Sequence, residues 1–450
     1  MPSQLEQKIE NLDQKQLSDL VKLLVSSSSD AKKQTELFIA SFDPKKASSI
    51  INKLITSFKN WVKRADFYDS REASRRIEEI TIPIERYLLR NAPDLAVIAL
   101  QKIIEQDQNV FRRIDDSYGW VGSQYTECFK LLDAAFSLST ISPDQIAKYL
   151  VDTYINDEYG GRSYLFDHVK LALQGERAES LKKVIEEYAA SNKLSSYQEE
   201  GMRLCYADLI KDVDLYIDIV RKFSDPPSLN DICDIARRLI SHFRSEEAIT
   251  WLTEYDVKVN EGHLRSRKIN LLEEAYCLEG DTENAKKLLW DYFTQTQSAD
   301  YFKRYCKYCD ESDKIKAKED ALNLAKNTDC LNTAIVFLDD IDELALLGQL
   351  IISRHEELDS HYYSLYRAVS KRVGVEMPLA GVLLRRAIIL DILDHAKSKI
   401  YSHAVSDLKI CNKFSEQVAD WGIFEDQVQF LSRLKSLHSK KKKFWLLYEE

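Results

Sequence analysis

Asp115 and Asp116 are adjacent carboxylates in the segment Ile114-Asp115-Asp116-Ser117-Tyr118-Gly119-Trp120, which falls between two predicted helices. Two carboxylates held close together raise the pKa of one of them and could serve acid/base catalysis or bind a divalent cation. The structural alternative, which we favour, is that Asp115 or Asp116 caps the next helix while Gly119 forms a turn. Tyr118 and Trp120 make the same segment a candidate binding site.

The C-terminal segment His438-Ser439-Lys440-Lys441-Lys442-Lys443-Phe444-Trp445 combines positive charge with two large aromatic residues. Basic residues beside aromatic ones suit stacking on nucleic-acid bases or binding to an anionic membrane surface. We favour a structural interpretation, in which the lysines form a solvated last helical turn that complements the helix dipole. Phe444 and Trp445 would then pack back on the protein.

Cys306 and Cys309 have the spacing of half a zinc site, but no second cysteine or histidine pair completes it. We therefore interpret them as half-buried helical cysteines and expect no metal and no cofactor. Glycines form neither a phosphate-binding loop nor a dinucleotide fingerprint, and no Gly-x-Ser-x-Gly motif is present. These absences favour a protein that is not an enzyme.

Composition favours helices, since the 450 residues are 44% apolar and 30% charged and include only 12 Gly and 8 Pro. A net charge of −10 argues against coating nucleic acid with the whole surface. The segment from Leu379 to Leu393 is the most apolar, but Arg385 and Arg386 interrupt it, so it predicts a core helix and not a transmembrane segment. No export signal is recognisable, and eight irregularly spaced cysteines fit a reducing compartment, so we expect a cytoplasmic protein.

Helix start signals recur along the chain. Asp13 with Gln16 predicts a capping box, Asp43 precedes Pro44, and Ser142-Pro143-Asp144-Gln145 combines a cap, a first-turn proline and a reciprocal glutamine. No alternating apolar and polar stretch bounded by turn signals predicts a strand. The chain is therefore predicted to be all-α.

Two segments look like copies of one helical hairpin, with Ala248 and Ala285 at equivalent positions 37 residues apart. Gly280-Asp281 would end one helix and start the next, whereas Phe243 stands where the second copy has Gly280. The pattern resembles a tetratricopeptide hairpin and predicts an α-solenoid of stacked helical hairpins. We expect an N-terminal helical region over 1–225 and tetratricopeptide-like repeats over 226–450, or else one continuous solenoid.

The order of several short motifs resembles a bacterial family of helical-repeat proteins of unknown function, sometimes linked to SWIM-type zinc fingers. The motifs are Asp115 to Gly119, Asp157 to Gly160, Ala248 to Trp251, Gly280 to Trp290, Tyr366-Arg367 and His438 to Trp445. The resemblance implies a bacterial cytoplasmic helical-repeat protein and brings no activity or cofactor. The Cys-x-Cys and Cys-x-His pairs of the finger are not in this sequence.

Our first functional hypothesis is a non-enzymatic scaffold whose concave face binds an unidentified protein through exposed Tyr and Arg side chains. Alternatives are a nucleic-acid-associated regulator that uses Lys440 to Lys443 with Trp445, and a metal-assisted enzyme that uses Asp115 and Asp116. Nucleic acid is the less favoured partner because four lysines do not offset the overall negative charge beyond a screening length of about 8 Å.

Overall fold

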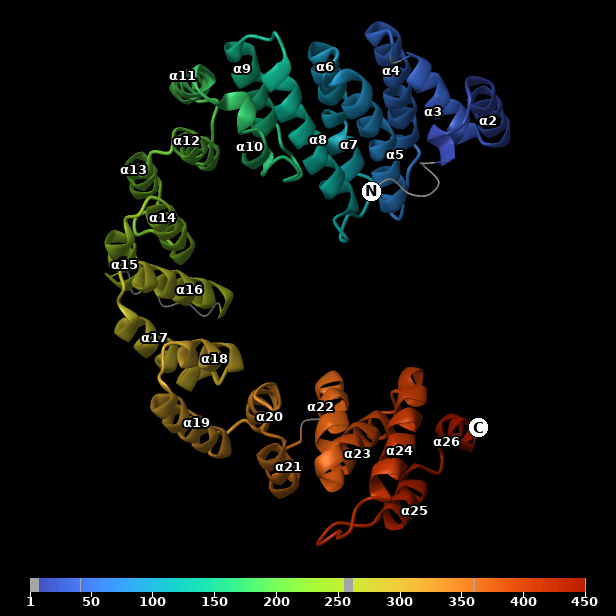
Figure 1. Cartoon of the computed structure of the whole chain (residues 1–450), viewed down its shortest axis with the longest axis vertical. Coiled ribbons are helices and arrows are strands. Elements are labelled where there is room, and N and C mark those ends of the chain that lie inside the picture. The colour runs from blue at the N-terminus through green and yellow to red at the C-terminus, as the bar shows by residue number, and fades with distance from the viewer. Residues whose placement is uncertain (1–7, 41, 255–261, 359–360, 450) are drawn as a thin grey trace. The chain divides into compact units, whose positions relative to one another are not determined.

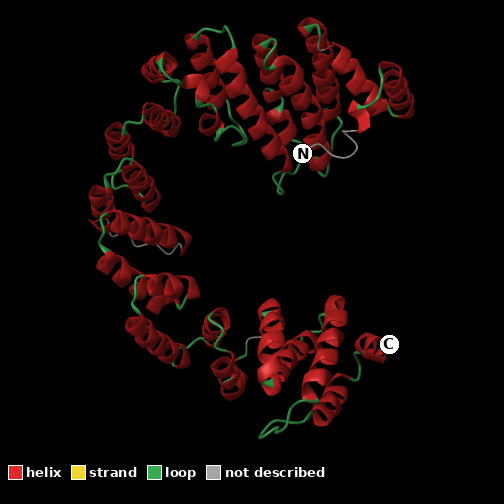
Figure 2. Cartoon of the chain, viewed as in Figure 1, coloured by secondary structure: helices red, strands yellow, loops and turns green. Residues whose placement is uncertain are grey.

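The computed structural model describes residues 8–40, 42–254, 262–358 and 361–449. Over these residues the chain contains helices and loops and no strand, as Figure 2 shows. The all-α prediction is therefore confirmed. None of the described helices is long and apolar enough to cross a membrane.

The chain divides into two compact units, Met1–Arg238 and Leu239–Glu450. The helices that begin in the first unit are α2 (Gln14–Ser27), α3 (Ser29–Ala40), α4 (Pro44–Val62), α5 (Ser70–Pro83), η1 (Ile84–Leu88), α6 (Pro93–Ile104), α7 (Asp107–Phe111), α8 (Trp120–Leu138), α9 (Pro143–Ile155), α10 (Leu165–His168), η2 (Leu171–Leu173), α11 (Glu176–Ala190), α12 (Ser196–Ile210), α13 (Val213–Phe223) and α14 (Leu229–Ser241).

The second unit continues with α15 (Ser245–Glu254), α16 (Gly262–Leu278), α17 (Thr282–Thr296), α18 (Ala299–Lys307), α19 (Glu311–Lys326), α20 (Leu331–Asp340), α21 (Leu344–Ser353), η3 (His355–Glu357), α22 (Tyr363–Glu376), α23 (Pro378–Asp394), η4 (Ser398–Ile400), α24 (Tyr401–Ser415), α25 (Gln427–His438) and α26 (Lys442–Glu449). Figure 1 labels the α-helices for which there is room.

Helices pack mainly against their neighbours in the sequence. In the first unit α4, α5, α6 and α8 form one block, and α9, α11, α12 and α13 then pair in succession. In the second unit α15 to α18 pair in the same way, and α22, α23 and α24 pack together. Each unit buries its apolar side chains between consecutive helices, as the prediction of stacked hairpins requires.

The predicted helix starts are confirmed. Asp13 and Gln16 form a capping box, as do Ser142 and Gln145, and the Asp43 carboxylate accepts two backbone N–H groups at the start of α4. These signals are local, because each cap satisfies N–H groups within three residues of itself.

Within the described residues, six helices end in the same left-handed turn. Each turn has one residue with φ between +51° and +72°, and the N–H of the next residue donates to the carbonyl five positions before it at 2.8–3.0 Å. This is the Schellman arrangement, which satisfies carbonyls at a helix end. In these six turns the residues with positive φ are Asn192, Lys211, Phe243, Gly280, Asp342 and Ala396. Phe243 thus adopts the backbone conformation of Gly280, its counterpart in the predicted repeat.

The most apolar segment forms α23, and most of its side chains are buried, as predicted for a core helix. Arg385 is buried there because it pairs with Asp407 and donates from Nε to the hydroxyl of Ser370 at 2.6 Å. Its charge is therefore compensated inside the second unit.

Candidate interaction surface

Three links between helices of the first unit lie next to one another. They are residues 63–69 before α5, residues 112–119 before α8 and residues 156–164 before α10. The backbone N–H of Asp115 donates to the carbonyl of Phe67 at 2.9 Å, which joins the first two links. Arg112 joins the second to the third, because its Nε donates to the hydroxyl of Tyr159 at 3.4 Å.

Aromatic side chains are exposed on all three links. Tyr68 is 87% exposed and Tyr118 86%, while Phe67, Trp120 and Tyr159 are each about half exposed, at 55%, 44% and 45%. We call these five residues the aromatic edge. Side chains this large and this exposed are available to a partner, and Tyr and Trp are the residues that anchor protein interfaces best.

Arginines lie beside the aromatic edge. The guanidinium carbon of Arg71 is 5.3 Å from the centre of the Trp120 ring. Arg112, besides its contact with Tyr159, is 3.8 Å from the carboxylate of Glu158. The edge therefore combines Tyr, Trp and Arg, with charges of both signs at its border.

The two carboxylates of the Asp115-Asp116 pair have different local roles. Asp116 accepts the N–H groups of Val121 at 2.9 Å and Gly122 at 2.8 Å, which caps the start of α8. Asp115 instead accepts the N–H of Ser117 at 3.0 Å, which stabilises the turn within the second link. The capping interpretation is confirmed for Asp116, and both carboxylates help to fix the loop that carries Tyr118.

A buried ion pair holds the third link. The Nε of Arg162 donates to Oδ2 of Asp107 at 2.6 Å, and Nη2 donates to Oδ1 at 2.7 Å. Both side chains are almost fully buried. Burial raises the pKa of Asp107, and the hydrogen bonds and charge of Arg162 oppose that rise. Such a pair fixes the position of the loop, because neither charge can be left alone in the interior.

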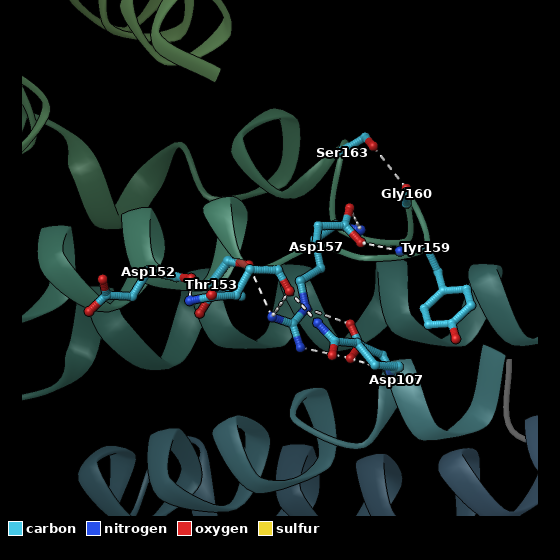
Figure 3. A network of polar contacts seen from close by, with 10 residues as sticks. Asp107, Asp152, Thr153, Asp157, Tyr159, Gly160 and Ser163 are labelled. Carbon is cyan, nitrogen blue, oxygen red and sulfur yellow. Dashed lines mark hydrogen bonds and ion pairs between the residues drawn. The ribbon is translucent and has the colours of Figure 1, made fainter. Parts of the chain in front are cut away.

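The same loop is tied at a second point. Asp157 accepts the backbone N–H of Arg162 at 2.8 Å and that of Tyr159 at 3.2 Å. Figure 3 shows that the ring of Tyr159 points away from this polar network. The network therefore holds the backbone of the link while leaving the aromatic ring exposed.

No sequence signal identifies Asp107 or Arg162 as a pair. They are 55 residues apart and neither belongs to a recognisable motif. For Asp157, Tyr159 and Gly160, the only sequence signal is the family resemblance.

At the C-terminus, the structure corrects the position of the lysines. Lys440 and Lys441 lie between α25 and α26, and Lys442 and Lys443 begin α26, so the predicted last helical turn is wrong for all four lysines. Packing of the aromatic residues sets the position of these lysines, because α26 begins where the Phe444 side chain enters the core.

Trp445 is only 9% exposed, and its indole N–H donates to the carbonyl of His438 at 2.9 Å. It is not available to stack on a base. His438 is also buried, with its Nε2 3.2 Å from Asp394. The prediction that Phe444 and Trp445 pack back on the protein is confirmed.

Cys306, in α18, is half-buried, as predicted. Cys309 is buried and follows the end of that helix, so the prediction of a half-buried helical cysteine is wrong for Cys309. Across the described parts of the chain, no three His, Cys, Asp or Glu residues are grouped as metal ligands would be.

The second unit contains a hollow of about 560 Å³ beside α23. Its polar groups serve internal contacts: Asp391 pairs with Lys397 at 2.6 Å, and Arg433 donates to Glu425 at 2.9 Å. Arg386 donates to the carbonyl of Glu425 at 2.8 Å. The two contacts of Glu425 hold the loop that precedes α25.

No curated protein is similar to this chain. Among solved structures, a "circular tandem repeat protein with novel repeat topology and enhanced subunit contact surfaces" matches 91% of this chain and 96% of its own at 13% identity. The TM-score is 0.17, which is too low to indicate a shared arrangement. A family model described as a family of unknown function, DUF6880, matches residues 3–447. Because this match spans nearly the whole chain, the protein belongs to the DUF6880 family.

Proposed function

We propose that this protein is a non-enzymatic protein–protein interaction scaffold of the bacterial cytoplasm, and that the aromatic edge binds a segment of a partner protein. The observation that carries the proposal is the exposure of Tyr68 and Tyr118 on links whose backbones are fixed. The family resemblance supports a bacterial origin, and eight cysteines that form no disulfide with one another are consistent with a reducing cytoplasm.

The composition of the aromatic edge favours binding. A few Tyr, Trp and Arg residues supply most of the free energy of a typical interface. Tyr and Trp also contribute a large contact area while losing few rotatable bonds on binding. The edge offers Tyr68, Tyr118, Trp120 and Tyr159, with Arg71 and Arg112 beside them.

Rigidity of the links also favours binding. A loop that is already ordered loses less conformational entropy when a partner docks. Asp116 fixes the second link through the α8 cap, and the Arg162–Asp107 pair fixes the third. The backbones that carry the exposed rings are therefore already ordered and lose little further conformational entropy on binding.

The two alternatives have weaker support. Nucleic-acid binding through the C-terminus loses its stacking group, because Trp445 is buried. A metal-assisted reaction at Asp115 and Asp116 competes with the backbone hydrogen bonds that these carboxylates accept. Neither alternative gains an observation of its own.

The test is quantitative affinity purification with two matched triple variants. The first replaces Tyr68, Tyr118 and Tyr159 by alanine. The control also introduces three alanines, in place of the exposed Phe243, Ile423 and Val428 of the second unit. We expect a protein recovered with the natural chain to fall at least about tenfold with the first variant and to stay with the control. Equal recovery with both variants would contradict the proposal.

A further inference from the structure

A cavity of about 400 Å³ adjoins the third link of the first unit, where Ser163 forms part of its wall. Tyr154 of α9, Phe166 of α10, Tyr197 of α12 and Tyr216 of α13 also line it. The ring centres of Tyr154 and Phe166 are 5.3 Å apart, so they form a continuous aromatic wall. The faces of such rings attract cations.

Charged side chains in the wall add an excess of carboxylates. Asp167, Asp208 and Asp234 line the cavity together with Lys170 and Arg238. Three negative and two positive groups leave one formal negative charge. In the described structure Asp167 makes no ion pair, which leaves it able to meet an incoming cation.

The cavity wall already holds one guanidinium in this way. The guanidinium carbon of Arg238 is 3.7 Å from the centre of the Tyr216 ring. Arg238 also donates two hydrogen bonds of 2.6 Å to the carboxylate of Asp208. An aromatic ring and a carboxylate therefore bind the guanidinium of Arg238 in this wall. Tyr154 and Tyr197 supply further aromatic rings, and Asp167 supplies a further carboxylate.

Gly201 explains how Tyr154 fits into the wall. A Cβ atom at position 201 would lie 2.8 Å from the hydroxyl oxygen of Tyr154, closer than such contacts occur. A glycine inside a helix destabilises that helix relative to alanine. Its presence in α12 makes room for the Tyr154 side chain and so keeps the wall in place.

We propose that this cavity binds an arginine side chain of the protein segment that docks on the aromatic edge. The source of the arginine rests on the proposed function, whereas the preference for a guanidinium rests on the cavity itself. The cation would lie against Tyr154 and Tyr197, with Asp167 accepting its hydrogen bonds.

Titration of the purified full chain with two short peptides tests the proposal. The probes are acetyl-Gly-Arg-Gly-amide and its citrulline analogue, which has nearly the same shape and no charge. The methyl NMR signals of Leu204 and Leu209, both in the cavity wall, report occupancy. We expect saturable shifts with the arginine peptide and at least tenfold weaker binding of the citrulline peptide. Equal binding of both, or binding of neither, would overturn the proposal.

Three variants and a control sharpen the result. Tyr197→Ala removes an exposed ring and should weaken binding of the arginine peptide about tenfold. Gly201→Ala should also weaken binding, because Tyr154 must shift. Lys170→Met removes a competing positive charge and should strengthen binding, so weaker binding by that variant would contradict the proposal. Tyr68→Ala, on the aromatic edge, should change nothing.

These titrations need no partner protein, so a negative result in them can be distinguished from a negative result in the affinity purification. Equal recovery of the partner with both triple variants, together with intact arginine binding, would overturn the proposed function and the source of the arginine, but not the preference of the cavity for a guanidinium. Capture that depends on the aromatic edge, without arginine binding, would overturn only the assignment of this cavity.

Discussion

Arg162 and Asp107 form two parallel N–H···O bonds of 2.6 and 2.7 Å in the interior of the first unit. The pair joins the loop before α10 to the first residue of α7. This bidentate geometry is the strongest form of a carboxylate–guanidinium contact. It places a structural ion pair directly beneath the loop that exposes Tyr159.

Replacing Asp107 by asparagine should destabilise the first unit strongly. The change keeps the shape of the side chain but leaves Arg162 buried without its counter-charge. We expect the free energy of unfolding to fall by about 3–5 kcal/mol. Urea unfolding followed by pulsed hydrogen exchange measures this, because it reports the two units separately.

Asp144→Asn is the matched control for that variant. Asp144 and Lys183 also form an ion pair in the first unit, at 3.8 Å, but both side chains are exposed. We expect a loss below about 0.5 kcal/mol. Similar losses of unfolding free energy for Asp107→Asn and Asp144→Asn would show that burial of the Arg162 pair does not increase its contribution to stability.

Phe243→Gly should stabilise the second unit. Phe243 has a φ of +59° and is 90% exposed, so it bears the strain of a left-handed conformation with little packing in return. We expect a gain of about 1 kcal/mol in the free energy of unfolding. Gly280→Ala, at the equivalent turn with a φ of +72°, should lose a similar amount. Thermal unfolding of both variants measures the two effects, and the same sign for both would refute this explanation.

Asp116→Ala should loosen the start of α8. It removes the acceptor of the Val121 and Gly122 N–H groups and should cost about 1–2 kcal/mol. Hydrogen exchange at these two amides should accelerate accordingly. Asp116→Asn keeps one acceptor oxygen, so it should restore the protection of only one of the two amides. Unchanged exchange in the alanine variant would mean that Asp116 is not the cap.

Cys330 should be the fastest of the cysteines to react with iodoacetamide at pH 7. It is exposed, and hydrogen bonds from Thr333 lower its pKa, so more of it is thiolate. Burial instead raises the pKa of Cys205 and Cys411 to about 12, which keeps those thiols protonated. Peptide mass spectrometry after brief alkylation measures the order in which the cysteines react.

Thr333→Val provides the control for the thiol prediction. Losing the hydroxyl should raise the pKa of Cys330 and slow its alkylation several-fold at pH 7, with little effect at pH 10. Faster labelling of Cys205 than Cys330 would contradict the structural argument.

Features set by neighbouring residues could be predicted from the sequence. The Asp13–Gln16 and Ser142–Gln145 capping boxes and the turn at Gly280 were predicted because each depends on a few consecutive residues. Helical periodicity likewise predicted the all-α fold. Asp116 was one of two candidate caps, and the structure selects it.

Features set by packing could not be predicted. Asp107 and Arg162 meet only after α7, α9 and the loop before α10 have packed. Phe67 and Tyr118 likewise share a surface because of a backbone hydrogen bond between two distant links. Burial of Phe444 was expected, but no local signal marks Lys442 as the start of a separate helix, α26.

Photocrosslinking at single positions shows whether the aromatic edge contacts a partner protein. A benzophenone amino acid placed at Tyr118, in cells of the natural source, should form a covalent adduct with one partner protein. The same group at Phe243, which is equally exposed in the second unit, should not. Trp120→Ala should reduce the adduct at position 118 about tenfold while the chain stays folded. No adduct at position 118, or an equal adduct at 243, would contradict the account.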